Sequence, residues 1–402
     1  DCDLCRAWRG YGKSVTVQIP PNAKSGIYAV HVTAGNEEAW ITFVVRAGSG
    51  SKSPVLVLAP TLTWHAYSNR AIAEERDSGL SLYTNHVDGT ANYYCTLHKP
   101  NYSLSPKDYF KARGMTVASY PCSHLVMAHL YLIHWLEHMN VDYEVISDHD
   151  LHSDGSAALN PHRVLFFAGH HEYWTHEMLD GLEEYLGQGG RLINLAGNAL
   201  YWVTSLHPEK PYLMEVRRYG GLAVAQAEPG ELQHSFTGEP GGTWRHRGRT
   251  PNQLIGVGMM ASGFFDKGAG YCRLPGSFDP RVGFIFDGIE ADEIIGDFGL
   301  NQGGASGYEM DAADDDLGTP PGSLVLGSSF GFAPSFSLTV EEGVAHGPDP
   351  KVRSDMVYFE TGQGGAVFSV GSVTWPGSLS HNGFHNNVSR LTWNTLNHFL
   401  NS

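Results

Sequence analysis

A dense group of ionisable side chains follows a short apolar run near the middle of the chain. The run, residues 163–168 (RVLFFA), leads directly into residues 169–174 (GHHEYW). Two imidazoles, a carboxylate and a phenol so close together could transfer protons or bind a metal ion. In extended backbone alternate residues share a face, so we expect His170 and Glu172 to point to one side and Tyr173 to the other. A solvated polar turn, with its aromatic rings packed for stability, is the alternative.

Two tyrosines lie in the segment that follows an earlier apolar run, residues 54–59 (PVLVLA). They are Tyr67, in the string TWHAYSN, and Tyr83, in the string LSLY. A phenolate is a hard oxygen donor that suits ferric iron better than zinc, and the metal must displace a proton whose pKa is about 10. Paired tyrosine ligands would therefore require a strongly Lewis-acidic ion. The alternative is that both are ordinary half-buried tyrosines with hydrogen-bonded hydroxyls.

Two further polar residues are candidates for chemistry. Asn198 comes just after the apolar run 191–196 (RLINLA), where its amide could donate to a substrate oxygen; an Asx turn is the alternative. Glu309 lies in the glycine-rich run 303–311, where its carboxylate could act as a base; a solvated loop is the alternative. No cysteine occupies residues 169–174, so we do not expect thiol chemistry there.

The segments before these residues have the composition of strands in a parallel sheet. Short continuous apolar runs are typical of strands buried on both faces. Segments whose apolar residues recur at helical spacing lie between these runs. This order predicts an α/β fold, a parallel sheet with crossover helices, which binds ligands beyond the carboxyl ends of its strands. The sheet resembles that of a class I glutamine amidotransferase-like domain. The expected strands are 54–59, 141–147, 163–168 and 191–196, and the expected helices are 124–139, one with Thr175 as its N-cap, and 387–400.

The chain divides by composition into three parts. Residues 1–48 contain expected strands at 14–19, 26–33 and 39–46, which indicate the closing part of a small β-sandwich. Residues 49–53 (SGSKS) have the composition of a flexible linker. Residues 54–402 would form the α/β catalytic domain, whose long glycine-rich loops between 220 and 350 are expected to be functional.

Charge and cysteine content exclude several classes of protein. The net charge of −16 argues against a nucleic-acid partner, and no apolar run reaches the roughly 20 residues that span a bilayer. Five unevenly spaced cysteines do not form a disulfide framework, and the Cys2–Cys5 pair lacks the second pair of a zinc site. Reduced thiols, and no signal peptide in the sequence given, indicate a cytoplasmic protein. Because Asp1 is not a start methionine, we expect a processed or truncated chain.

From near Cys2 to its C-terminus the chain resembles the catalytic, C-terminal part of the N,N-dimethylformamidase large (beta) subunit family. Many uncommon strings occur in one order, which chance does not readily produce. The strings are TLxxxAYxN (61–69), GLSxY (79–83), HxDG (86–89), HxEY (170–173), NxxYW (198–202), HPEKPxxMEVR (207–217), GYExD (307–311) and NNVS (386–389).

The resemblance implies an amide hydrolase that converts small N-substituted formamides to an amine and formate. It implies a single iron ion, expected as Fe³⁺, held by Tyr67, Tyr83 and Glu172. The assignment of Tyr83 depends on the LSxY string, and Tyr93 and Tyr94 are the alternatives.

The resemblance places His170, Asn198 and Glu309 near the metal, and the chemistry of these residues suggests their roles. Asn198 would donate to the oxyanion, His170 would protonate the departing amine, and Glu309 would take a proton from water. Trp174 and Tyr201 would shape a pocket for N-methyl groups.

The resemblance further implies a hetero-oligomer. The family's large subunit carries an N-terminal lectin-like region that the sequence given does not include, and it pairs with a small helical subunit. Two other functions are open: a non-catalytic glutamine amidotransferase-like binding module, and a metal hydrolase of another small amide.

Overall fold

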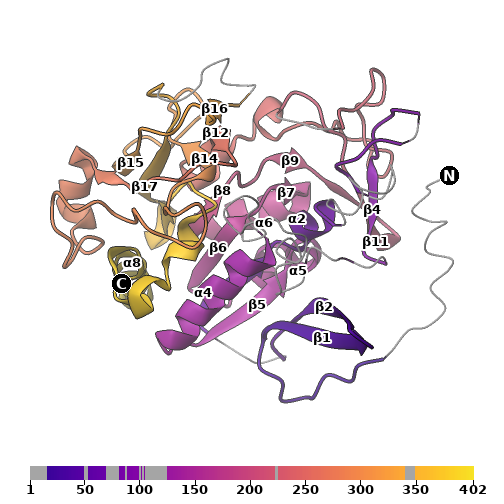
Figure 1. Ribbon diagram of the computed structural model, residues 1–402, viewed down its shortest axis with the longest axis horizontal. Coiled ribbons are helices and arrows are strands. Elements are labelled where there is room, and N and C mark those ends of the chain that lie inside the picture. The colour runs from indigo at the N-terminus through magenta and orange to yellow at the C-terminus, as the bar shows by residue number, and fades with distance from the viewer. Residues whose placement is uncertain are drawn as a thin grey trace.

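The computed structural model describes residues 16–48, 53–68, 81–86, 88–98, 101, 104, 125–221, 225–339 and 349–402 (Figure 1). Several parts of the sequence-based predictions lie outside these residues. They are residues 1–15 with the Cys2–Cys5 pair, linker residues 49–52, Asn69, Gly79, Leu80, Cys122 and the first residue of the helix expected at 124–139.

An eight-stranded sheet forms the centre of the molecule, in the order β13-β15-β17-β18-β8-β6-β3-β5 (Figure 1). From β18 to β5 all neighbours pair parallel, whereas β13, β15 and β17 extend the sheet antiparallel. The parallel strands are β3 (Val55–Ala59), β5 (Tyr143–Ser147), β6 (Val164–His170), β8 (Arg191–Gly197) and β18 (Ala366–Ser369). The others are β13 (Cys272–Arg273), β15 (Leu324–Ser329) and β17 (Ser354–Glu360). The likeness to a glutamine amidotransferase sheet stays a prediction.

The order of the parallel strands creates a switch point between β3 and β6. From β3 the chain moves outward to its neighbour β5, and from β6 it moves in the opposite direction to β8. Right-handed crossovers then place the connecting helices α4 (Val126–His138) and α6 (His176–Gly187) on opposite faces. In open α/β sheets the crevice beyond the carboxyl ends of the strands at such a point is the usual ligand site.

The N-cap that the sequence predicts at Thr175 is confirmed, and the closing helix also has a side-chain cap. The Thr175 side chain accepts a hydrogen bond from Met178 N at the start of α6. The closing helix α8 (Asn387–Asn401) begins after Asn386, whose side chain accepts from Ser389 N at 2.9 Å. Helix α5 (Asp148–Asp154) follows β5 directly. No helix in the described residues is long and apolar enough to cross a membrane.

The N-terminal segment is a two-stranded antiparallel ribbon, β1 (Gly26–Ala34) and β2 (Glu37–Val45). The strand expected at residues 14–19 is wrong for residues 16–19, which are not in a strand. These residues pair with no strand in the described part of the chain, and Val17 and Ile19 are exposed. Within residues 16–48 no second sheet is present, so a β-sandwich stays a prediction for the chain as a whole.

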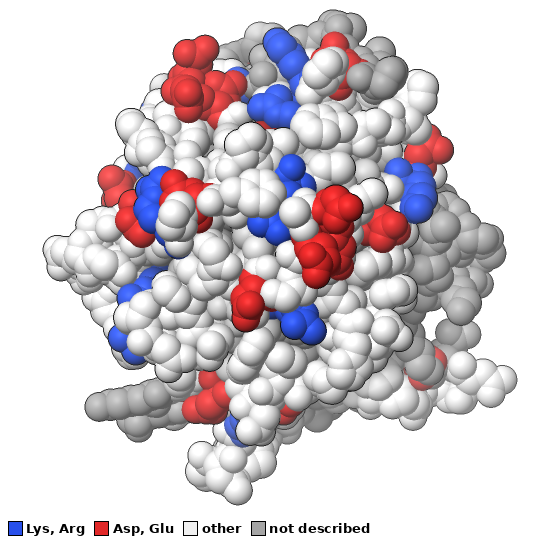
Figure 2. All heavy atoms as spheres, turned by 90° about the vertical axis from the view of Figure 1, so that its left-hand side faces the viewer, with Lys and Arg blue, Asp and Glu red and all other residues white. Residues whose placement is uncertain are grey.

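Small sheets surround the carboxyl ends of the central strands. One contains β12 (Gly258–Gly263), β14 (Tyr308–Ala312) and β16 (Ser337–Leu338), and another contains β4 (Tyr94–Thr96), β10 (Ser205–His207) and β11 (Lys210–Glu215). A third pairs β7 (Tyr173–Trp174) with β9 (Trp202–Val203). Helix α2 (Thr61–Ala66) follows β3, and α7 (Pro251–Ile255) precedes β12. On the face shown in Figure 2, acidic and basic side chains are interspersed.

Candidate functional site

The candidate residues meet at the switch point of the sheet. Tyr67 ends helix α2, which follows β3, and His170 is the last residue of β6. Asn198 comes directly after β8. Glu309 arrives on β14, a strand of a separate sheet.

Two phenols and a carboxylate face one another in this crevice. The rings of Tyr67 and Tyr83 have centroids 4.5 Å apart. The hydroxyl of Tyr83 lies 3.4 Å from Glu172 Oε2, and the hydroxyl of Tyr67 also hydrogen-bonds this carboxylate. Tyr67 is 5% exposed and Glu172 is 4% exposed. The two phenol oxygens and the carboxylate, all possible metal ligands, therefore lie close together in a buried place.

A second group of polar atoms adjoins the first through His170. Its Nε2 lies 2.8 Å from Glu309 Oε2 and 3.4 Å from Glu172 Oε2. Asn198 Nδ2 donates to Glu309 Oε2 at 2.9 Å and lies 3.4 Å from His170 Nε2. The imidazole is fully buried between two carboxylates, so a proton can be exchanged within this group.

The backbone at the strand ends is locked by specific contacts. Thr63 Oγ1 accepts from the N–H of Glu172 at 3.0 Å and from that of Tyr173 at 3.3 Å. Asn198 has φ +46°, which is costly for a residue with a side chain, and Asp311 Oδ1 accepts from its N–H at 2.7 Å. A Cβ at Gly197 would overlap the Glu309 carbonyl, so β8 and β14 approach closely only because this residue is glycine.

Burial and crowding shift the pKa values of these acids. Burial, together with the charge of Glu172, raises the pKa of Tyr67 and Tyr83 well above the usual value. Burial also raises the pKa of Glu172 and brings that of Asp311 to about 7. Burial lowers the pKa of His170, but Glu309 and Glu172 outweigh it and raise the pKa overall. A bound cation would reverse these shifts and favour the anionic oxygens.

The donor set fits a ferric ion. Among the residues that the structure describes, no three or more His, Cys, Asp and Glu side chains are grouped to hold a metal ion. Two phenols and a carboxylate supply oxygen donors for a metal here, and Tyr67, Tyr83 and Glu172 would hold it. Hard oxygen donors of this kind suit iron(III) better than zinc.

Tyr173 contradicts the expectation from strand alternation. Its hydroxyl lies 2.6 Å from that of Tyr83, inside the site rather than on the opposite face. Strand β6 ends at His170 and β7 begins at Tyr173, so the backbone turns between them and the two-residue period does not hold. The expectation that Tyr173 points away is wrong.

The other aromatic candidates have different partners. Trp174 donates to His171 O and packs against Phe167 in the core. Tyr93, an alternative ligand in the sequence, accepts from Glu228 N at 3.0 Å, and the Tyr94 hydroxyl lies 2.8 Å from Ser235 Oγ.

Two residues at the site have roles that the sequence does not indicate. Trp202 Nε1 donates to Glu172 Oε1 at 2.9 Å. Arg218, which is 2% exposed, donates to the hydroxyl of Tyr173 at 2.6 Å. Trp202 lies in the string NxxYW (198–202), one of those that carry the resemblance, but Arg218 has no spacing that would mark it.

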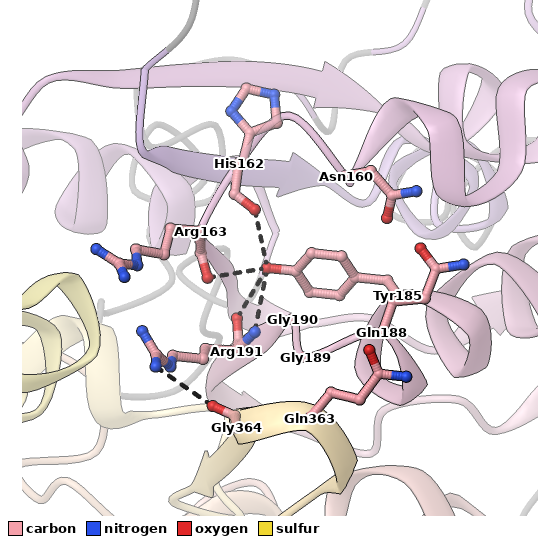
Figure 3. Close-up of a pocket in the computed structure, with 10 residues that line it drawn as sticks. All are labelled: Asn160, His162, Arg163, Tyr185, Gln188, Gly189, Gly190, Arg191, Gln363 and Gly364. Atoms are coloured by element: carbon pink, nitrogen blue, oxygen red, sulfur yellow. Dashed lines mark hydrogen bonds between the residues drawn. The ribbon is translucent and has the colours of Figure 1, made fainter. Parts of the chain in front are cut away.

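A cavity of about 390 Å³ lies away from these residues, at the amino ends of β6 and β8 (Figure 3). The Tyr185 hydroxyl contacts backbone atoms of His162, Arg163 and Arg191 there. Arg163 and Arg191 donate to carbonyls at the end of α8, as cations near a helix C-terminus commonly do. This cavity therefore has a structural explanation and is not the candidate site.

Replacing Thr63 by valine should lower the free energy of unfolding by about 1–3 kcal/mol, because two buried N–H groups lose their acceptor. Thr395→Val is the matched control, since this buried hydroxyl donates to Leu391 O within α8. Chemical denaturation of both variants measures the difference. Equal stability of the two variants would mean that Thr63 does not hold the turn.

Comparison with known proteins identifies the family of the chain. A profile of the family described as N,N-dimethylformamidase beta subunit-like, C-terminal, matches residues 2–388. The N,N-dimethylformamidase beta subunit of Paracoccus aminophilus is 38% identical over 434 aligned residues, and that of an Alcaligenes species is 37% identical. Each alignment covers 100% of this chain and 55% of the relative, so the chain spans about half the length of these relatives. The chain belongs to the N,N-dimethylformamidase beta subunit-like family, in its C-terminal part.

Proposed function

We propose that this protein hydrolyses N,N-dimethylformamide and similar N-substituted formamides to an amine and formate, with one ferric ion as cofactor. The observation that carries the proposal is the convergence of Tyr67, Tyr83 and Glu172 at the switch point of the sheet. The names of the two relatives support the substrate class. An iron ion, when bound, would polarise the amide carbonyl and acidify a water molecule.

The chain's own residues would move the protons. Glu309 would take a proton from the attacking water, and His170, 2.8 Å away, would give one to the departing amine nitrogen. An amine leaves far more readily when protonated, so this transfer is needed for the C–N bond to break. Asn198 holds the Glu309 carboxylate through one N–H, and its second N–H is the candidate donor to the oxyanion.

The proposal extends to partners and location. Both relatives are named beta subunits, which supports a hetero-oligomer, and we propose the small helical subunit as the partner. Cys95 and Cys272 are free thiols, in keeping with a reducing cytoplasm.

The purified chain, without a partner subunit, should self-associate or have low activity. The reason is that a beta subunit is expected to leave its partner-binding surface exposed. Light scattering with a formate assay measures both properties. A fully active monomer would contradict the proposed assembly.

The substrate is tested by product analysis on the protein with any subunit that co-purifies. N,N-dimethylformamide should yield formate and dimethylamine in equal amounts, and N-methylformamide should also be cleaved. Cleavage of another small amide but no formamide would favour the broader metal hydrolase. No cleavage by the intact complex, together with no bound iron, would favour the binding module.

A further inference from the structure

A buried arginine lies behind the tyrosines of the site. The Arg218 guanidinium carbon is 4.5 Å from the ring centroid of Tyr83, 5.6 Å from that of Tyr173 and 5.9 Å from that of Trp202. Its two terminal nitrogens donate to Leu82 O at 2.7 Å and to the Tyr173 hydroxyl at 2.6 Å. Ring faces and two charge-assisted hydrogen bonds stabilise the cation away from water.

The chemistry of arginine fixes the direction of the hydrogen bonds that follow. A guanidinium can only donate, so the Tyr173 oxygen is the acceptor of the bond from Arg218. The single proton of Tyr173 must then point elsewhere, and the Tyr83 oxygen lies 2.6 Å away. We take Tyr83 as the acceptor of the Tyr173 proton, because the hydroxyl of Tyr83 is itself placed to donate to Glu172 Oε2 at 3.4 Å.

We propose that Arg218 and Tyr173 are positioning residues that hold the Tyr83 oxygen in place through a one-way hydrogen-bond chain, from Arg218 to Tyr173 to Tyr83. The chain therefore presents a hydrogen-bonded phenol oxygen, fixed in position, to a metal. This role as a ligand support rests on the proposed function; the hydrogen-bond chain itself does not.

The neighbouring Arg217 supplies a matched control. Its Nη2 donates to the Tyr94 hydroxyl at 3.1 Å, and its guanidinium carbon lies 4.4 Å from the Tyr93 ring centroid. Arg217 and Tyr94 thus form an arginine–tyrosine pair like that of Arg218 and Tyr173. The Tyr94 hydroxyl bonds to Ser235 and not to a residue of the site. Tyr94→Phe therefore removes an arginine-bound hydroxyl without touching the proposed chain.

The test uses metal-free protein labelled with carbon-13 at the ζ position of tyrosine. The NMR signal of Tyr83 is assigned as the one lost in Tyr83→Phe. Tyr173→Phe, which keeps the ring, and Arg218→Met should each shift this signal, Arg218→Lys should shift it less, and Tyr94→Phe should leave it in place. An unmoved Tyr83 signal in Tyr173→Phe would overturn the inference, whatever the iron content.

Iron binding then separates this inference from the proposed function. Tyr173→Phe should weaken iron binding by about 10–100-fold, the usual effect of losing a group behind a ligand, and should shift the phenolate-to-iron absorption band. Normal iron affinity and an unchanged band in Tyr173→Phe would show that Tyr173 does not support a metal ligand. A shifted Tyr83 signal in a protein that binds no iron would sustain the hydrogen-bond chain and refute the iron site.

Discussion

Tyr67→Phe and Tyr83→Phe should each lower iron affinity by more than about 100-fold, which exceeds the usual effect of changes behind a ligand. Each change removes one oxygen donor and leaves the ring in its place. The visible absorption expected from iron-bound phenolate should fade in both variants, and formate release should fall with it. Iron content, the absorption spectrum and product analysis measure the three effects.

Folding should survive both substitutions, because a volume-conserving change leaves the packed ring in position. Tyr94→Phe is the control, and it should keep iron, colour and activity, since its hydroxyl bonds to Ser235 and Arg217. Full iron and activity in Tyr83→Phe would mean that the second phenolate is a different residue.

His170→Ala should lower turnover by about 10²–10⁴-fold while iron stays bound, because His170 is assigned to proton transfer and not to the metal. The imidazole lies 2.8 Å from Glu309, which is the geometry that proton exchange requires. Glu309→Gln should reduce turnover in the same range. Steady-state kinetics and metal analysis on the same preparation measure both properties.

The neighbouring His171 provides the matched control. It is fully buried, its Nε2 accepts from Ala168 N at 3.2 Å, and its ring stacks on Phe167. His171→Leu should affect stability and leave the turnover of the folded enzyme largely intact. Loss of iron in His170→Ala, but not in His171→Leu, would show that His170 is a ligand and that the donor set is incomplete.

Much of the site could be predicted because it depends on local sequence. Short apolar runs identify β3, β6 and β8, and the strand-end rule then selects the segments that carry Tyr67, His170, Glu172 and Asn198. The helix N-cap at Thr175 is equally local. These features depend on residues that are close together in the sequence, so the sequence pattern is enough to predict them.

The remaining features depend on contacts between distant segments. Arg218 meets Tyr83 across more than a hundred residues, and Glu309 arrives on a strand of a separate sheet. The backbone turn that brings Tyr173 into the site breaks the two-residue period that a strand pattern assumes. No local signal specifies such pairings, since long-range packing decides them.

The most direct test of the proposed function is metal analysis of the active protein, joined to formate release before and after iron is removed. The proposal predicts iron near one atom per chain, little zinc, loss of formate release on chelation and recovery on adding back iron. Full activity in metal-free protein, or zinc at full occupancy in the active protein, would contradict it.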